Sequence, residues 1–401
     1  MAESLRVVWS PALLDYDFGL SHPMSPLRLK LTMDLAQALG LLDAPGVRVV
    51  GVEPASMTEL LTVHDASYVA AVMSASAGED LELSTAGNGN PAFGLGTEDD
   101  PVFAGMHEAA ARIVAGSVAG ATAVWSGESV HAVNVTGGMH HAMPSTASGF
   151  CVYNDAAVAI RRLLADGAER VAYVDVDAHH GDGVERIFWD DPRVLTVSVH
   201  ESGRTLFPGT GHPSDIGGPG AQGTAVNVAL PAGTGDAGWL RAVSAVVPAV
   251  IRAFAPSMIV SQHGCDAHAL DPLANLRVSV DAQRWVAEML HDLAHEVSGG
   301  RWLALGGGGY AVIDVVPRAW SQLIAIAGHV ALDPATPLPP AWRADVAEHW
   351  GRTPPELMTD GADLAFSDWR GGYDPADDVD RAVRATRDSV FPHLGLDPQH
   401  D

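Results

Sequence analysis

Short apolar segments rich in β-branched residues recur along the chain and alternate with longer alanine-rich segments. The apolar residues of the short segments run on without strict alternation, which is typical of strands buried on both faces of a sheet. Strands are expected at residues 6–10, 47–52, 130–135, 170–176, 194–199, 258–262 and 302–306. The longer segments suit helices, at residues 104–125, 155–168, 238–254 and 281–298. This alternation predicts an α/β fold with a parallel sheet between helices.

Two segments rich in glycine and aspartate, 80–101 and 201–223, are expected to be long loops, which usually have functional roles. After residue 330 the composition shifts toward Pro, Trp and Asp, which predicts a strap over 331–376. A terminal amphipathic helix is expected over 378–393. No repeat or linker interrupts the chain, so we expect a single domain over residues 1–401, with the core at about 5–330.

Polar or glycine-rich motifs follow five of the expected strands. They are TGGMHHA, DVDAHHGDG, SVHESG, QHGCD and GGGGY. Ligands of open parallel sheets bind outside the carboxyl ends of the strands. The five motifs are therefore expected to meet at one shared site.

Two of these motifs carry groups suited to a metal ion. Strand side chains alternate between faces, so Asp177 and His179 form a plausible ligand pair, with Asp175 one step deeper. A third ligand, an oxygen, can come from Asp266. Two carboxylates and one imidazole suit Zn²⁺ or Fe²⁺, and three protein ligands leave a position open for water and substrate.

The remaining motifs add groups that move protons. His140 and His141 stand in tandem after two glycines, and Asp175 and Asp182 are the acids available to orient them. The GGGGY turn presents the hydroxyl of Tyr310. A metal, two His–Asp pairs and a phenol suit the metal-assisted hydrolysis of an amide.

The motifs GGMHHAMPSTASGFCVYNDAAVAI, VDVDAHHGDGVE, QHGCDAHALDPL and GGGGY resemble those of the zinc-dependent histone deacetylase family. The resemblance covers roughly residues 5–330, in order, and is closest to the bacterial acetoin-utilisation (AcuC-type) deacetylases. It implies the arginase/deacetylase-like fold, with a central parallel sheet of about eight strands. The pair His263 and Cys265 departs from the pattern of the class I enzymes.

The resemblance also implies a role for each matched residue. The implied zinc ligands are Asp177, His179 and Asp266. The implied catalytic groups are His141 as general base, His140 as its electrostatic partner, Asp182 and Asp175 as their carboxylates, and Tyr310 on the acetyl carbonyl. The implied substrate-binding residues are Phe150, Phe207, Gly149, Leu273 and one of Asp99 and Asp100. Arg28 matches an arginine of the family's acetate channel. A structural potassium ion is expected at Asp175, Asp177, His179, Ser198 and Val199.

Composition bears on partners and location. The formal net charge of −26 disfavours binding to nucleic acid or to anionic membranes. Two cysteines in apolar or glycine-flanked stretches, Cys151 and Cys265, and no signal peptide favour a reducing cytoplasm. The expected partner is an acetylated protein, for which the AcuC-type resemblance suggests acetyl-CoA synthetase.

Three other functions stay open. The same chemistry would serve an acetylpolyamine amidohydrolase, although the apolar Leu273 favours acyl-lysine. DAHHGD also resembles the signature of dinuclear manganese ureohydrolases, and an acyl-lysine binding protein could keep the scaffold without catalysis. The sequence leaves open the oligomeric state, the acyl-chain preference and the choice between zinc and iron.

Overall fold

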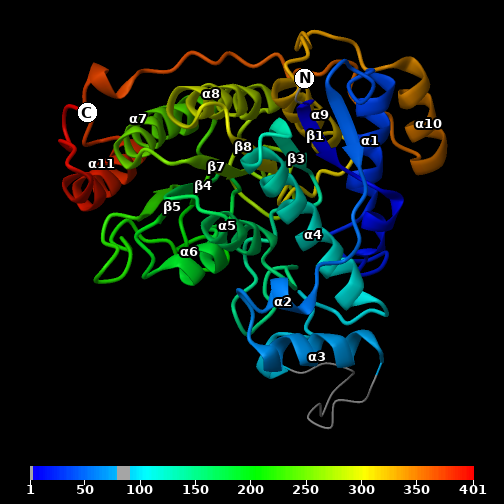
Figure 1. The fold of residues 1–401 in the computed structure, drawn as a ribbon. Helices are drawn as coiled ribbons and strands as arrows, with labels where there is room; N and C mark the ends of the chain where they lie inside the picture. The colour runs from blue at the N-terminus through cyan, green and yellow to red at the C-terminus, as the bar shows by residue number, and fades with distance from the viewer. Residues whose placement is uncertain (1–2, 79–90) are drawn as a thin grey trace.

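The computed structural model of the protein describes residues 3–78 and 91–401. Its strands form one parallel sheet of eight, in the order β2-β1-β3-β8-β7-β4-β5-β6 (Figure 1). The strands are β1 (Glu3–Val8), β2 (Val47–Val50), β3 (Ser129–Asn134), β4 (Val171–Asp175), β5 (Val194–Glu201), β6 (Ala225–Leu230), β7 (Met258–Gln262) and β8 (Trp302–Leu305). This sheet is the one that the motif resemblance implies.

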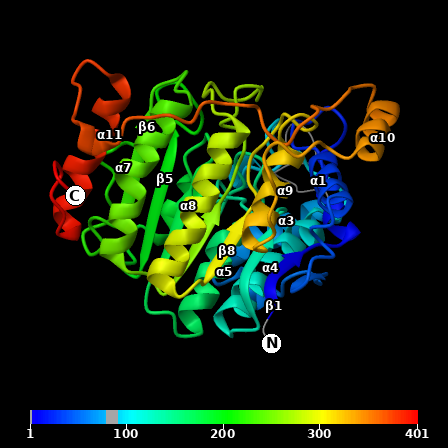
Figure 2. The ribbon, with the colours of Figure 1, turned by 90° about the horizontal axis from the view of Figure 1, so that it is seen from above.

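Helices cover both faces of the sheet (Figures 1 and 2). One face carries α1 (Leu27–Ala38), α7 (Asp236–Phe254), α8 (Val280–Ser298) and α9 (Val316–Ala327). The other face carries α4 (Met106–Trp125), α5 (Asp155–Ala165) and α6 (Asp182–Phe188). The short α2 (Met57–Leu60) and α3 (Ala66–Ser76) lie beyond this second layer. All eight strands run parallel, so their carboxyl ends share one edge.

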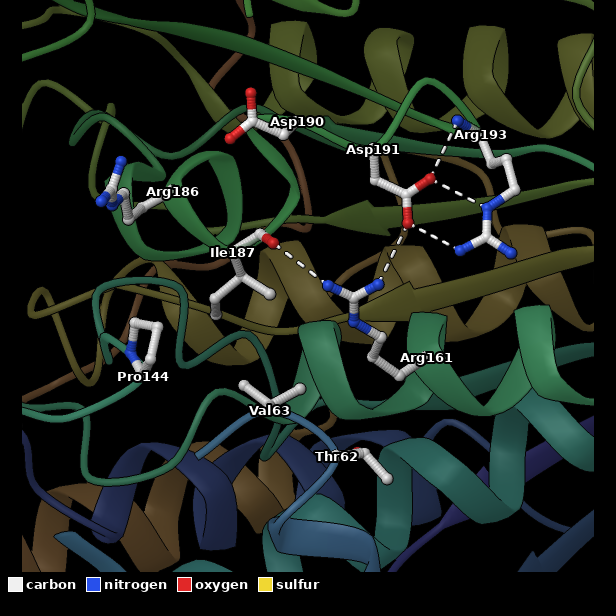
Figure 3. Close-up of a pocket in the computed structure, with 9 residues that line it drawn as sticks. All are labelled: Thr62, Val63, Pro144, Arg161, Arg186, Ile187, Asp190, Asp191 and Arg193. Carbon is white, nitrogen blue, oxygen red and sulfur yellow. Dashed lines mark hydrogen bonds and ion pairs between the residues drawn. The ribbon is translucent and has the colours of Figure 1, made fainter. Parts of the chain in front are cut away.

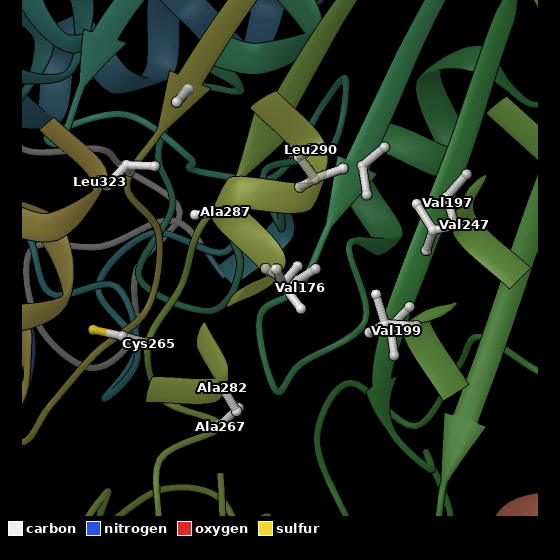
Figure 4. Close-up of a cluster of buried hydrophobic side chains, with 14 of the residues drawn as sticks. Val176, Val197, Val199, Val247, Cys265, Ala267, Ala282, Ala287, Leu290 and Leu323 are labelled. Atoms are coloured by element: carbon white, nitrogen blue, oxygen red, sulfur yellow. The ribbon is translucent and has the colours of Figure 1, made fainter. Parts of the chain in front are cut away.

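The side chains of β4 and of the segment after it alternate between the two layers. Val174, Val176 and Ala178 belong to the core cluster under α7 and α8, which Figure 4 shows in part around Val176 and Leu290. Tyr173 belongs to the core cluster on the opposite face. Alternation of this kind sends Asp175 and Asp177 away from the apolar layer of Val174 and Val176, at the point where the strand ends.

All seven expected strands and all four expected helices are present, with ends shifted by a few residues. The eighth strand, β6, lies at the edge of the sheet; its segment TAVNVAL is strand-like in sequence, although it is not among the seven strands expected above. The expected strap over 331–376 contains a helix, α10 (Pro340–Trp350), which packs on α1 through Trp342 and Val346.

The chain ends in α11 (Asp378–Val390) and a 3₁₀ turn (Phe391–Leu394), close to the expected 378–393. α11 packs beside β6 and α7 at the sheet edge. Of the expected loop 80–101, residues 80–90 lie outside the described residues. Residues 91–93 form a 3₁₀ turn.

By length and composition, α7 could cross a membrane, with a mean hydropathy of 1.3 over an 18-residue window. However, 61% of that window is buried inside the protein. Trp239, Val243 and Val250 of this helix are fully buried in the core cluster. The apolar character of α7 is therefore explained by its place against the sheet.

Candidate active site

Three predicted metal ligands meet at the carboxyl edge of the sheet. Asp177 and His179 follow β4, and Asp266 follows β7, the neighbouring strand. One ligand atom of each lies within 4.8 Å of those of the other two, and all three residues are buried. His179 Nδ1 lies 3.1 Å from Asp177 Oδ1 and 3.0 Å from Asp266 Oδ2. These three donors therefore converge on one point.

The surrounding backbone holds the two carboxylates in place. Asp177 Oδ2 accepts hydrogen bonds from Gln262 Nε2 and from the Gly308 amide, each at 2.8 Å. Asp266 Oδ1 accepts one from the Ala178 amide at 2.8 Å. A Cβ atom at Gly308 would overlap the carboxylate of Asp266 and approach Asp177 Oδ2 to 2.8 Å. Only glycine fits at this position, because the backbone of the GGGGY turn passes so close to the two carboxylates.

The two buried carboxylates of this cluster, Asp177 and Asp266, favour the binding of a cation between them. Burial and the nearby Asp177 raise the pKa of Asp266 to about 8. Burial also opposes the charge of Asp177, but His140 and His179 hold the pKa of Asp177 well below its usual range. Two buried carboxylates this close repel each other unless a positive charge lies between them. The donor set, two carboxylates and one imidazole, fits a divalent ion such as zinc or iron.

Each tandem histidine is paired with a buried carboxylate. His140 Nδ1 donates to Asp175 Oδ2 and His141 Nδ1 donates to Asp182 Oδ1, both at 2.7 Å. These are the two pairings that the resemblance implied. Asp175 also accepts hydrogen bonds from the Tyr173 hydroxyl at 2.8 Å and from the Asp177 amide at 3.1 Å. In both histidines the Nε2 atom is left to act on a ligand.

The two histidines have opposite charge preferences, although their ring centroids are only 4.0 Å apart. Burial opposes the charged form of His140, but Asp175 and Asp177 raise the pKa of His140 to about 9. Burial and the neighbouring His140 lower the pKa of His141 to about 4. At neutral pH, His140 is therefore cationic and His141 is neutral and able to accept a proton.

Aromatic rings flank the approach to these groups. The ring of Phe207 lies 5.0 Å from that of His141 and is 44% exposed. The ring of Phe150 lies 5.7 Å from that of Tyr310. Gly149 has a φ of +53°, and a Cβ atom there would come within 2.9 Å of the Phe207 ring and overlap His141. The glycine thus keeps open the space between the aromatic ring and the histidine.

Tyr310 is held through its backbone. Its amide donates to Asp271 Oδ2 at 2.8 Å, and Asp271 Oδ1 accepts from the Leu273 amide at 2.9 Å. Asp271 therefore links the glycine-rich turn to the segment of Leu273, a half-buried residue. Burial and the carboxylates of Asp266 and Asp177 raise the pKa of Tyr310 well above its usual range. Its phenol consequently stays protonated and can donate a hydrogen bond.

The two candidate rim aspartates differ in exposure. Asp100 is buried, its Oδ1 has no hydrogen-bond partner within the described parts of the chain, and burial followed by Asp99 raises its pKa to about 8. Asp99 is exposed, and its carbonyl accepts from His22 Nε2 at 3.2 Å. The His22 ring lies 4.6 Å from that of Phe150. Of the two, Asp99 is therefore the one whose side chain is accessible from solvent.

Arg28 comes from α1, far from the motifs in sequence. Its buried guanidinium donates to the Gly307 carbonyl at 2.6 Å and lies 5.2 Å from the centre of the Trp320 ring. It thus lies behind the glycine turn that leads to Tyr310.

The residues expected to hold potassium lie on β4, on the segment that follows it, and on the adjacent strand β5. Asp175 pairs in register with Ser198 across β4 and β5, and Val199 follows it. Ser198 Oγ lies 2.9 Å from His200 Nδ1.

Other histidines near the site have protein partners. His180 is buried, with Nδ1 2.9 Å from Thr210 Oγ1 and Nε2 3.2 Å from Glu185 Oε2. His200 is also buried, whereas His212 is exposed in the loop that follows β5. Burial lowers the pKa of His263 to about 3, and its Nε2 lies 2.7 Å from Ser261 Oγ. The contacts of His180, His200 and His263 give these three buried histidines structural roles around the site.

Sequence reasoning missed three supporting residues: Gln262, Tyr173 and Asp271. Gln262 precedes the ligand Asp266 by four residues, and Tyr173 precedes Asp175 by two on the same strand. Strand periodicity could have flagged Tyr173 as a neighbour of that carboxylate. Asp271 gave no such signal, because its contact with Tyr310 depends on how two loops meet.

A separate surface pocket of about 570 Å³ lies beside α5 and α6 (Figure 3). Its lining contains Arg161, Arg186 and Arg193 but none of the residues described above. Asp191 accepts hydrogen bonds from Arg161 at 3.0 Å and from Arg193 at 2.8 Å. Two of the three arginines are therefore already paired, and the pocket is not part of the candidate active site.

Comparison with known proteins agrees with this geometry. A histone deacetylase domain matches residues 22–327, which is most of the chain. The chain belongs to the histone deacetylase family, and it is a hydrolytic deacetylase.

Among its relatives, the chain is similar to the acetoin utilization protein AcuC of Bacillus subtilis (strain 168). The two are 41% identical over 358 residues, which span 89% of this chain and 90% of that protein. The acetoin utilization protein AcuC of Staphylococcus xylosus is 36% identical over 85% of this chain and 87% of its own length. The similarity to AcuC proteins thus extends over nearly the whole chain.

Proposed function

We propose that this protein is a zinc-dependent lysine deacylase, which removes acetyl groups from lysine side chains of proteins. The convergence of Asp177, His179 and Asp266 beside a neutral His141 is the observation that carries this proposal. These three residues would hold the ion. A zinc ion in this position supplies Lewis acidity, which polarises the acetyl carbonyl and makes water a stronger acid.

His141 is proposed to act as the general base. Its Nδ1–H is held by Asp182, so its Nε2 is free to take a proton from the attacking water. The cationic His140, 4.0 Å away, stabilises negative charge that develops in the transition state. His141 then returns the proton to the departing lysine amine.

Tyr310 is proposed to support the oxyanion. Its phenol stays protonated and donates to the carbonyl oxygen as that oxygen gains negative charge. Phe150 and Phe207 would enclose the acyl-lysine side chain, and Asp99 would accept hydrogen bonds from the substrate backbone at the entrance. Arg28, behind the Gly307 turn, would attract the acetate product.

Protein lysine is proposed as the substrate in preference to a polyamine because of Leu273. This residue is half-buried, and its amide is fixed by Asp271. An apolar side chain there gives a polyamine cation no counter-charge. The similarity to AcuC proteins suggests acetyl-CoA synthetase as the substrate protein, and the composition suggests the cytoplasm.

The same carboxylates would hold a structural potassium ion. Asp175, Asp177, His179, Ser198 and Val199 are the residues proposed for it. The dinuclear manganese alternative is less well supported, because a second ion would need another bridging pair of aspartates. Among the described residues, the candidate ligands that group at this edge are Asp177, His179 and Asp266, and Asp266 is the one acid of the QHGCD motif.

Turnover on a panel of acyl-lysine peptides and acetylpolyamines tests the proposal. The protein would be assayed as purified, after chelation, and after adding back zinc, iron or manganese. We expect hydrolysis of acetyl-lysine peptide, its loss on chelation and its recovery with zinc. Faster turnover of acetylspermidine would favour the polyamine function. Binding of acetyl-lysine peptide by the zinc-loaded protein without hydrolysis would show that it is a binding protein.

A further inference from the structure

Four histidines gather far from the catalytic groups, at the other end of the sheet. His131 lies in β3, His291 and His295 lie on α8, and His329 follows α9. His131 pairs in register with Trp302, the first residue of β8, whereas the catalytic turn at Gly307 follows the last residue of that strand. The cluster is therefore at the amino end of β8 and the active site is at its carboxyl end.

The four rings are close to one another. The centroid of the His131 ring lies 5.0 Å from that of His291, 5.1 Å from that of His295 and 5.0 Å from that of His329. One nitrogen of each of the four lies within 4.8 Å of one nitrogen of the others. With nitrogen–metal distances of about 2.0 Å, the nitrogens of a tetrahedral zinc site lie about 3.3 Å apart. Small side-chain rotations would bring these four to that spacing.

His131 has one buried nitrogen, Nε2, that makes no hydrogen bond within the described part of the chain. Its side chain is fully buried, and its Nδ1 donates to the Ala327 carbonyl at 2.8 Å. That bond places the proton on Nδ1 and leaves Nε2 as an acceptor. Nε2 has no hydrogen-bond partner within the described residues. A buried acceptor without a donor is costly, and a metal ion is a partner that would satisfy it.

His291 also has its Nδ1 beside an acceptor and its Nε2 toward another histidine of the cluster. Its Nδ1 lies 3.1 Å from Asp292 Oδ1, and its Nε2 lies 2.8 Å from His329 Nε2. Metal-binding histidines usually donate their far nitrogen to a carboxylate or a backbone carbonyl, as His291 and His131 do here. His291 and His295 are also separated by four residues on one helix, which places both rings on the same face.

The surroundings favour the neutral form, which is the form that binds metal, in His131, His295 and His329. Burial, together with the neighbouring histidines, lowers the pKa of His131 to about 3. Burial and nearby histidines also lower the pKa values of His295 and His329. His329 adopts a φ of +55°, a conformation rare for histidine, and this fixes where its ring is presented.

We propose that His131, His291, His295 and His329 form a second metal site, which binds one divalent transition ion of the zinc type through four imidazole nitrogens. Imidazole ligands select zinc and its neighbours over magnesium or calcium. Four protein ligands leave no open position, so the site is structural. It fastens α8 to β3 and to the turn after α9.

Metal stoichiometry tests this site. Untagged protein would be dialysed against excess free zinc, then against buffer, and its zinc content measured. We expect two zinc ions per chain for the wild type and one for the double variant His295→Gln/His329→Asn. Asparagine suits the positive φ of residue 329. The control is His349→Gln, which changes an exposed histidine of α10 outside the cluster and should keep two ions.

Two further measurements separate this site from the catalytic one. The double variant should keep wild-type turnover of acetyl-lysine peptide, because neither residue lies at the active site, and retained turnover also shows that it folds. When zinc-free protein is titrated with zinc, the thermal unfolding temperature should rise in two phases for the wild type, one for each site. For the double variant it should rise in one phase. One zinc per chain in the wild type, or two in the double variant, would overturn the proposal.

Discussion

His140 and His141 lie next to each other in sequence, with ring centroids 4.0 Å apart, yet their surroundings drive them to opposite charge states. The carboxylates of Asp175 and Asp177 overcome burial and raise the pKa of His140 to about 9. Burial and His140 itself lower the pKa of His141 to about 4. The cation thus keeps its neighbour neutral, which a general base requires at neutral pH.

Replacing the partner of the proposed base tests this division of roles. In Asp182→Asn, the amide can donate to Nδ1 and favour the tautomer with the proton on Nε2, which cannot accept one from water. We expect kcat on an acetyl-lysine peptide to fall by about 10²–10⁴-fold, the range of general base catalysis. Asp190→Asn, which changes an exposed carboxylate in the pocket of Figure 3, is the control. Normal kcat in Asp182→Asn would contradict the role of His141.

Tyr310→Phe removes one proposed donor to the oxyanion and little volume. Losing a single such donor typically costs about 10²–10³-fold in kcat. The ring contact with Phe150 is kept, so KM and zinc content should change little. Steady-state kinetics and metal analysis of the same preparation check both expectations. A raised KM with an unchanged kcat would instead assign Tyr310 to substrate binding alone.

Much of this site could be predicted because its residues follow buried strands. The alternation of Val174, Asp175, Val176 and Asp177 shows where β4 ends and which face each residue takes. The strand order 3-8-7-4 could not be predicted in this way, because hydrophobic patterning carries no information on which strands are neighbours. That order is what brings Asp266 beside Asp177.

Contacts between segments far apart in the chain could also not be predicted from the sequence pattern. Arg28 and Gly307 are 279 residues apart, and nothing in the pattern of α1 indicates a bond between them; only the motif resemblance pointed to Arg28. The cluster of His131, His295 and His329 draws on separate elements whose spacing matches no motif. The segment of β6, TAVNVAL, is strand-like in sequence, but nothing in it indicates that the strand lies at the edge of the sheet beside β5.

Gly149→Ala tests whether the space between Phe207 and His141 is needed. The added methyl group would overlap the His141 ring and come within 2.9 Å of the Phe207 ring. The positive φ of residue 149 also disfavours alanine, by about 1 kcal/mol. We expect a large loss of kcat/KM on acetyl-lysine peptide with a thermal unfolding temperature only a few degrees lower. Gly167→Ala, a positive-φ glycine in open space, controls for the backbone cost.

Asp360 joins the C-terminal segment to the core. Its Oδ1 accepts from Arg318 at 2.8 Å, and its Oδ2 accepts from His268 and from the Val280 amide, each at 2.9 Å. Burial opposes its charge, but His268 and Arg318 hold the pKa of Asp360 far below its usual range. Because the folded state binds the proton more weakly, this carboxylate stabilises the protein above its unfolded pKa of about 3.9. The stabilisation is lost as the pH falls below that value.

Asp360→Ala would leave the buried Arg318 guanidinium without its counter-charge, so we expect the free energy of unfolding to fall by about 3 kcal/mol near neutral pH. The difference from wild type should persist down to about pH 5 and shrink below about pH 4, where Asp360 takes up a proton in the unfolded wild type while the folded carboxylate stays ionised. Urea unfolding at a series of pH values measures it. Asp345→Ala breaks the exposed pair with His349 and should cost less than about 1 kcal/mol. If the deficit of Asp360→Ala stays constant into the acid range, its origin is packing and not the charge of this carboxylate.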